Sequence, residues 1–211
     1  MEQFYKLLRD YNLLLSQSDE NFPEWLVQFT ENEPPLYWRT IYDLLKDTDK
    51  TQSIIEIGAG YGDITALLYY MGFKNVICYE MDTPKCSYIE NKIFSLFDFN
   101  PNIATTKYPQ KLGYTPDILL QVNCVYIDEE KNKSEYLGQI YDFYNANGTP
   151  KMYLIEVIDD SYKEDNDLFP NFVRLNENDI KQLFPMCSIS SYKTRIYPFN
   201  KVSKTLYRIC K

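Results

Sequence analysis

The chain has 211 residues, of which 45% are hydrophobic and 25% charged, so it can bury a core and is predicted to fold as one domain, residues 1–211. Its net charge of −8 argues against sequence-independent binding of nucleic-acid phosphates. The absence of histidine excludes Ser-His-Asp triads, Cys-His dyads and zinc sites built on imidazole. The longest apolar stretch, residues 64–73, is about half of the roughly 20 residues that span a bilayer, and the N-terminus lacks a signal-peptide pattern, so we expect a cytoplasmic protein without a membrane partner.

The first 50 residues are predicted to form a helical cap. Apolar side chains recur at helical spacing over residues 2–15, and Pro23 suits the first turn of a short second helix. After Pro34 and Pro35, a third helix is expected over residues 36–46. The rest of the chain, residues 51–211, is expected to form the core.

From residue 51 onward, short apolar runs alternate with helical patterns. Strands are predicted at 53–57, 76–79, 103–107, 118–126 and 152–158, and helices at 64–71, 85–96, 135–144 and 177–184. Two last strands, at 188–197 and 205–210, have no helix between them and imply an antiparallel edge. The predicted fold is therefore α/β: a Rossmann-like, doubly wound, mostly parallel seven-stranded sheet with an antiparallel C-terminal edge and an N-terminal helical cap.

A glycine turn joins the first predicted strand to the next helix. Gly58, Gly60 and Gly62 alternate with Ala59 and Tyr61, directly after the strand. Glycine is needed where the backbone turns sharply or must approach a ligand closely, and ligands of open α/β sheets bind beyond the carboxyl ends of the strands. A dinucleotide fingerprint is the rival interpretation, but its third glycine would come one residue later.

Two acidic residues flank this turn. Glu56 lies two residues before the first glycine, where it is suited to meet a cationic ligand group, and Glu80 follows the second strand, where it is suited to accept hydrogen bonds from ribose hydroxyls. The pattern resembles class I S-adenosylmethionine-dependent methyltransferases. The resemblance implies S-adenosylmethionine as cofactor and the following binding residues: Glu56, Gly58, Gly60, Tyr61, Gly62, Glu80, Met81 and Asn123.

The sequence departs from that family at the adenine site. The family usually places an aspartate after its third strand, and no acid occurs over residues 103–108, so Tyr108 is proposed to stack on adenine instead. No Asn-Pro-Pro-Tyr motif follows the fourth strand, which disfavours methylation of DNA bases. Asn123 is still expected near the transferred methyl group.

The methyl acceptor is expected to be a small polar molecule. Residues 194–197 and 203–206 are similar to segments of small bacterial sugar O-methyltransferases from surface-polysaccharide pathways. Tyr37 and Trp38 are adjacent on a helix and are expected to point to different sides, so that at least one faces the acceptor pocket.

The last 32 residues contain seven basic residues and no acidic one. They are interpreted either as a solvated edge hairpin or as the mouth of a site for an anionic acceptor, in which Arg195 and Tyr197 would bind the acceptor. A sugar phosphate or another phosphate-like group fits the second interpretation.

Methyl transfer is an in-line displacement that depends mainly on alignment and exclusion of water. With no histidine, the base candidates are acids after strands four and five, and Asp128 and Glu156 are chosen, with Asn123 as a third catalytic residue. An anionic acceptor would need no base, and no metal is expected. Two alternatives stay open: a methyltransferase acting on protein or RNA, and a non-catalytic methyltransferase-like subunit.

Overall fold

The computed structural model describes residues 1–19, 22–125, 132–163, 169–195 and 203–211. An N-terminal helical segment precedes the sheet and consists of α1 (Glu2–Ser18), η1 (Glu24–Thr30) and α2 (Leu36–Leu45). None of the helices in these described ranges is both long and apolar enough to cross a bilayer.

The first half of the sheet region follows the predicted alternation. Its elements are β1 (Ile54–Ile57), α3 (Asp63–Tyr70), β2 (Val76–Tyr79), α4 (Thr83–Phe97), β3 (Asn102–Ala104) and β4 (Ile118–Gln121). The second half adds α5 (Lys133–Asn145), β5 (Met152–Asp159), η2 (Asn171–Val173), β6 (Arg174–Leu175), α6 (Glu177–Leu183), β7 (Ser188–Arg195) and β8 (Ser203–Cys210).

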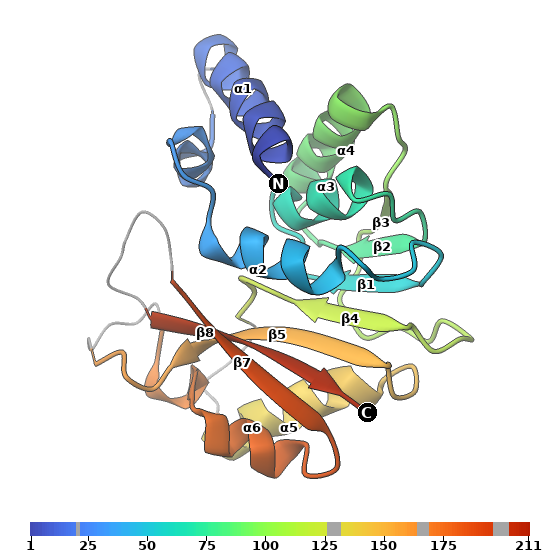
Figure 1. Ribbon diagram of the computed structural model, residues 1–211, viewed down its shortest axis with the longest axis vertical. Coiled ribbons are helices and arrows are strands. Elements are labelled where there is room, and N and C mark those ends of the chain that lie inside the picture. Colours follow the sequence, from blue (N-terminus) through green and yellow to red (C-terminus); the bar gives the residue numbers. More distant parts are fainter. Residues whose placement is uncertain (20–21, 126–131, 164–168, 196–202) are drawn as a thin grey trace.

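The strands form one sheet in the order β3-β2-β1-β4-β5-β8-β7 (Figure 1). All pairs on this path are parallel except those that β8 makes with β5 and β7. The predicted seven-stranded, mostly parallel sheet with an antiparallel C-terminal edge is therefore confirmed. The structure adds an eighth strand, the two-residue β6, which pairs with the end of β5 and is too short to give a sequence pattern.

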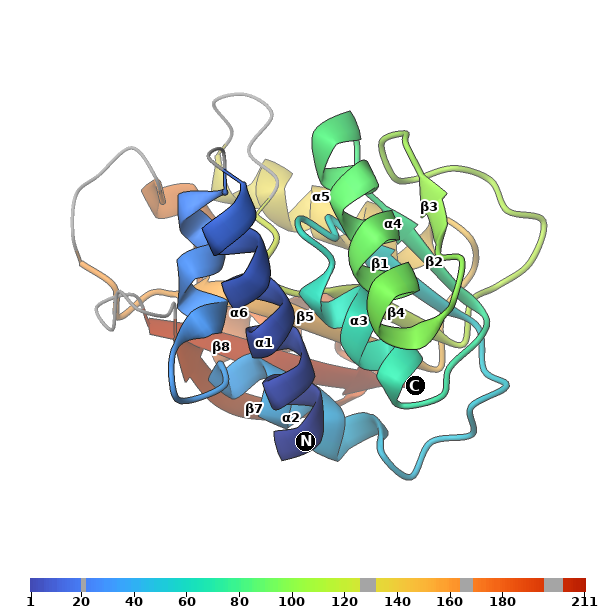
Figure 2. The same cartoon turned by 90° about the horizontal axis from the view of Figure 1, so that it is seen from above.

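Helices cover both faces of the sheet, because alternate strand residues point to opposite sides (Figures 1 and 2). On β1, Ile54 packs with the core that includes α1 to α4, and Ile55 packs with the core of α5 and α6. Phe4 of α1, Phe29 of η1 and Trp38 of α2 belong to the first core, so the N-terminal segment is packed onto the α3 side of the sheet.

Some predicted strands are shorter than expected. The strand predicted over 118–126 ends at Gln121, because Asn123 takes a φ of 53° that breaks the extended backbone. The strand predicted over 103–107 is limited to Asn102–Ala104. Both endings lie at the carboxyl edge of the sheet, where the strands give way to the loops that surround the glycine turn.

Candidate active site

Glycine is needed at the three positions of the turn for different structural reasons. All have positive φ, of 69° at Gly58, 56° at Gly60 and 75° at Gly62, which only glycine adopts without strain. A Cβ on Gly58 would lie 2.2 Å from Cys124 Sγ, and one on Gly62 would lie 2.6 Å from a side-chain carbon of Ile89. A Cβ on Gly60 would meet no atom within 4 Å. Gly58 and Gly62 therefore permit close packing, whereas Gly60 leaves bare backbone beside open space.

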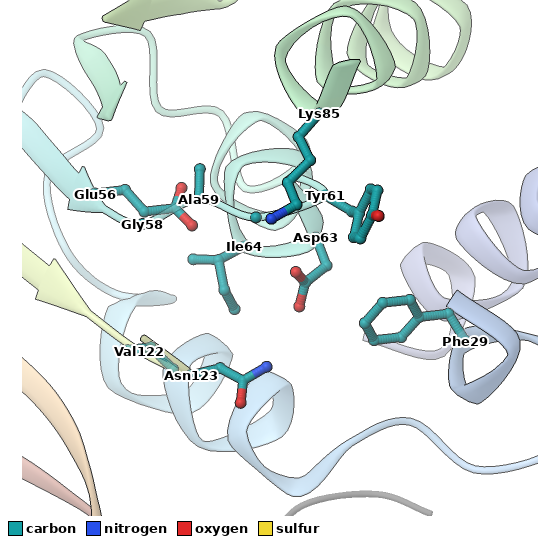
Figure 3. A pocket seen from close by; sticks show the side chains of 11 residues that line it. Phe29, Glu56, Gly58, Ala59, Tyr61, Asp63, Ile64, Lys85, Val122 and Asn123 are labelled. Atoms are coloured by element: carbon teal, nitrogen blue, oxygen red, sulfur yellow. The ribbon is translucent and has the colours of Figure 1, made fainter. Parts of the chain in front are cut away.

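That space is a cavity of about 350 Å³ at the carboxyl ends of β1 and β4 (Figure 3). Its walls come from η1, the glycine turn, the start of α3, the first turn of α4 and the loop after β4. The lining residues are Phe29, Glu56, Gly58, Ala59, Gly60, Tyr61, Asp63, Ile64, Lys85, Val122 and Asn123. The cavity thus brings together five of the predicted cofactor residues, from Glu56 to Asn123.

Glu56 is buried beneath the turn. Its Oε2 accepts a hydrogen bond of 2.5 Å from Thr65 Oγ1, and its side chain faces the cavity. Burial raises the pKa of this carboxyl from 4.5 to about 8, and the nearby charges of Asp63 and Glu80 raise it further, against the lowering effects of Thr65 and Lys92. A positive ligand group would favour the ionised form of Glu56.

Lys92 of α4 is a buried cation near the carboxyl groups of Glu56 and Asp63. It is 0% exposed, and its Nζ donates a hydrogen bond to the carbonyl of Tyr61 in the glycine turn. Burial lowers its pKa to about 8, partly opposed by the negative charges of Asp63 and Glu56. This hydrogen bond connects α4 to the glycine turn.

Glu80 follows β2 and fixes the turn from the other side. Its Oε2 accepts from the backbone N–H of Gly60 at 2.8 Å, and its Oε1 accepts from the N–H of Asp82 at 3.1 Å. The neighbouring Met81 is 55% exposed. Neither side chain is part of the cavity wall described above, and their roles toward ribose and adenine stay predictions.

Tyr37 and Trp38 do not diverge as expected. Tyr37 Oη donates to Asp63 Oδ2 at 2.7 Å, and Trp38 Nε1 donates to the same oxygen at 2.5 Å. The two rings are 3% and 0% exposed, and neither lines the cavity. The expectation that one of them faces an acceptor is corrected: their polar atoms converge because α2 packs across the start of α3, and both rings lie behind Asp63.

Asn123 stands at the end of a buried polar network. Its backbone N–H donates to Glu156 Oε2 at 3.1 Å, and its side-chain Oδ1 accepts from Lys204 Nζ. Glu156 also accepts from Thr194 Oγ1 at 2.6 Å and forms an ion pair with Lys204 at 3.2 Å. The side chains of Lys204 and Glu156 are 4% and 0% exposed.

This network corrects the role expected of Glu156. Both of its oxygens accept hydrogen bonds, and the residue is absent from the cavity wall, so its geometry does not support a general base. The carboxylate instead joins the middle of β5 to Asn123 after β4 and to the neighbouring ends of β7 and β8. Lys204 was missed in the sequence because its partners lie 48 and 81 positions away.

Tyr108 is also placed differently from the expectation. It is 1% exposed and packs edge-on against Tyr79 and Phe143 on the α5 side of the sheet. Its hydroxyl donates to the carbonyl of Phe143 at 3.2 Å. A ring buried in this core is not available to stack on adenine, so that prediction is wrong.

The remaining predictions fall partly outside the described residues. Asp128 and Tyr197 lie outside them, and Arg195 is described only as the last residue of β7. Two basic residues of the C-terminal segment are neutralised, Lys193 by Asp159 and Lys204 by Glu156, which weakens the interpretation of this segment as an anion-attracting mouth. Within the described part of the chain, no group of three or more Cys, Asp or Glu side chains is arranged to hold a metal ion.

Six wall residues were not among the predicted site residues, namely Phe29, Ala59, Asp63, Ile64, Lys85 and Val122. Asp63 directly follows the last glycine, so its position beside the turn was the signal that was available. Lys85 extends from the first turn of α4 over the turn, with its Nζ 5.6 Å from the centre of the Tyr61 ring. Phe29 approaches from η1, and nothing in its own sequence context indicates contact with a turn 30 positions later.

Comparison with known proteins shows which solved structures have a similar fold. No protein-family profile matches the chain, and no curated protein matches its sequence. Among solved structures, magnesium protoporphyrin IX methyltransferase (ChlM) from Synechocystis PCC 6803 with bound SAM is similar with a TM-score of 0.65 and 14% identity, over 99% of this chain and 97% of that one.

Two further solved structures are similar. The N-methyltransferase NodS from Bradyrhizobium japonicum WM9, in complex with S-adenosyl-L-homocysteine, gives a TM-score of 0.63 at 13% identity over 95% of this chain and 97% of that one. The methyltransferase domain of bacterial CtHen1-C gives 0.60 at 9% identity over 82% and 96%. The chain therefore has the Rossmann-like fold of S-adenosylmethionine-dependent methyltransferases.

Proposed function

We propose that the protein is an S-adenosylmethionine-dependent methyltransferase. The observation that carries this proposal is the bare backbone of Gly60, which faces a cavity whose walls also contain the carboxylates of Glu56 and Asp63. A cationic metabolite with a sulfonium and an ammonium group fits such a wall. The bound SAM and SAH in the similar ChlM and NodS structures support the same assignment.

The residues of the cavity wall fit the cofactor at its methionine end, and Glu80, which lies outside that wall, is proposed for its ribose end. The space beside Gly60, which a Cβ would enter, suits the close approach of the methionine part, and Glu80 at the end of β2 is suited to accept hydrogen bonds from ribose hydroxyls. The cofactor supplies a methyl group activated by a positively charged sulfur. The chain would hold it in place, exclude water and align the acceptor.

We further propose a small polar acceptor that presents an oxygen, such as a saccharide or a sugar phosphate. An ammonium has donors only, so the atom of Asn123 that faces Lys204 must be Oδ1, and its NH₂ group remains for the cavity. That NH₂ group would donate a hydrogen bond to an acceptor oxygen. Arg195 and Tyr197 stay candidates for acceptor binding.

Calorimetric titration with S-adenosylhomocysteine tests the cofactor assignment. We expect binding by the wild type, and a dissociation constant raised at least about tenfold in Gly60→Val and Glu80→Ala. Glu90→Ala, which removes an exposed carboxylate on α4, is the matched control and should bind normally. Normal affinity in both site variants would contradict the proposed site, and absence of wild-type binding would contradict the proposed function.

Transfer of radioactive methyl from S-adenosylmethionine tests the acceptor class. Sugar phosphates, nucleotide sugars, free monosaccharides, bulk tRNA and a protein mixture would be compared at equal concentration. We expect label on one of the three sugar classes. Label on tRNA or protein alone would favour macromolecular methylation, and binding without transfer to any of them would favour a non-catalytic subunit.

A further inference from the structure

Two carboxylates line the cavity, and their surroundings differ. Glu56 accepts a hydrogen bond from Thr65, and burial raises its pKa to about 8, which favours its protonated form at neutral pH. Asp63, the first residue of α3, accepts from both Tyr37 and Trp38 on a single oxygen, Oδ2. The two acidic side chains therefore differ in their hydrogen bonds, and we expect them to interact differently with a ligand.

The second oxygen of Asp63 is the one available to a ligand. No hydrogen bond to Oδ1 occurs among the described residues, although the residue is only 9% exposed. Figure 3 shows the Asp63 carboxylate pointing into the cavity, between Lys85, Phe29 and Asn123. This oxygen is open to the cavity and is not sealed in the core, so a cationic donor that enters the cavity could form a charge-assisted hydrogen bond with it.

The donors behind Asp63 are held rigidly. The Trp38 ring stacks on Phe29 at 4.9 Å between ring centres and meets Phe4 edge-on at 5.4 Å. Burial raises the pKa of the Tyr37 hydroxyl well above its ordinary value, so the hydroxyl stays protonated at neutral pH and remains a hydrogen-bond donor. The carboxylate of Asp63 is thus fixed in one orientation before a ligand arrives, which lowers the cost of binding.

We propose that Asp63, rather than Glu56, accepts the α-ammonium of the cofactor's methionine, with Tyr37 and Trp38 as positioning residues. The inference rests on the proposed function and goes further, because it makes the N-terminal helix α2 part of the cofactor site. The three residues come from two segments 25 and 26 positions apart, and the glycine motif alone does not indicate their meeting.

Three ligands distinguish the contribution of the ammonium contact to affinity from the contribution of the rest of the cofactor. S-Adenosylhomocysteine carries the ammonium, its deaminated analogue lacks only that group, and 5′-methylthioadenosine lacks the whole amino-acid part. For the wild type we expect the first to bind at least about tenfold more tightly than the second. In Asp63→Asn that preference should fall to about threefold or less, with the affinity for 5′-methylthioadenosine unchanged.

The variants of the neighbouring residues complete the test. Tyr37→Phe keeps the ring but removes the donor, and should lower the preference for the ammonium partially, again without affecting 5′-methylthioadenosine. Glu56→Gln should retain most of the preference. Asp43→Asn, an exposed acid on α2, is the control for charge and should behave as the wild type.

Several results would overturn the inference. A wild-type preference retained in Asp63→Asn and lost in Glu56→Gln would give the ammonium to Glu56. Equal loss of all three ligands in Asp63→Asn would make Asp63 structural. If the wild type binds none of the three, the proposed function itself fails, whereas binding without any preference for the ammonium refutes only the role of Asp63.

Discussion

Glu56 shows how a single buried carboxyl group shapes the pH response of this protein. In the unfolded chain it ionises near 4.5, and in the folded protein near 8. Between these values the folded state keeps a proton that the unfolded state has lost, so the free energy of unfolding falls as the pH rises, by about 1.4 kcal/mol per pH unit.

Glu56→Gln should remove this dependence. Its stability relative to the wild type is expected to improve by about 2–3 kcal/mol between pH of about 5.5 and about 7.5, measured by urea denaturation at both values. The range stops below the pKa of Lys92, near 8, so that only Glu56 titrates strongly. A stability difference that stays constant with pH would contradict the raised pKa.

Substitutions of Gly60 and Gly62 by alanine can be compared directly, because both glycines have positive φ but only Gly62 is packed against another side chain. Gly60→Ala meets open space, so its cost in stability should be the backbone strain of about 1–2 kcal/mol, while the dissociation constant for S-adenosylhomocysteine rises about tenfold or more. Gly62→Ala forces the Ile89 side chain to move and should lose more stability but less affinity. Thermal denaturation and calorimetry check both, and equal effects on affinity would argue against Gly60 as the point of closest ligand approach.

Residues of the site were predictable where the signal was local. Glu56 and the glycines lie in one short motif, and the chemistry of a strand-to-helix turn identifies them. Tyr108 and Glu156 were misread because burial and distant partners decide their roles: the first is covered by Phe143 of α5, and the second is held by Lys204 of β8. No property of either residue in isolation contains that information.

At the scale of elements, the ion pair of Lys204 and Glu156 joins β8 to the middle of β5, and hydrogen bonds extend this network to Asn123 after β4 and Thr194 of β7. Lys204→Met leaves Glu156 buried without its counter-ion and should lower the free energy of unfolding by about 3–5 kcal/mol. Lys204→Met combined with Glu156→Gln should recover much of that loss, since the amide oxygen can still accept from the Asn123 N–H while the NH₂ group faces the Thr194 hydroxyl, which can accept.

Urea denaturation of the two variants and of Glu156→Gln alone completes a double-mutant cycle. Additive losses would show that the two side chains are not coupled. Glu156→Gln alone leaves the Lys204 ammonium buried without its counter-ion, so it is expected to lose stability by an amount comparable to Lys204→Met.

The order of elements was predictable because hydrophobic periodicity differs so clearly between strands and helices. Alternation placed every strand of the sheet path, and the missing helix between the last two strands gave the antiparallel edge. The ends of the strands were less predictable. β4 stops where Asn123 adopts a left-handed backbone, and the apolar run beyond it continued to suggest a strand.

For the molecule as a whole, we propose that the N-terminal segment and the sheet unfold together. Phe4, Leu8 and Leu26 are each 0% exposed within the same core as Ile54 of β1. Both tryptophans, Trp25 and Trp38, lie in the N-terminal segment, whereas far-UV circular dichroism reports on all elements. Tryptophan fluorescence and circular dichroism should therefore give the same midpoint of denaturation.

Phe4→Ala offers a stricter version of this test. It should lower both midpoints equally, with a loss of about 3–5 kcal/mol for a fully buried phenylalanine. Separate transitions, with the fluorescence midpoint alone shifted, would show that the first 50 residues behave as an independent unit.

The described residues of the cavity wall all lie between Phe29 and Asn123, and β8 reaches it only indirectly, through Lys204. The chain is thus divided at the end of β4 into a half that grips the proposed methyl donor and a half that supports its far side. Such a division predicts that segments after β4 can be exchanged without altering the described wall of the cavity, as long as the contact of Lys204 with Asn123 is kept.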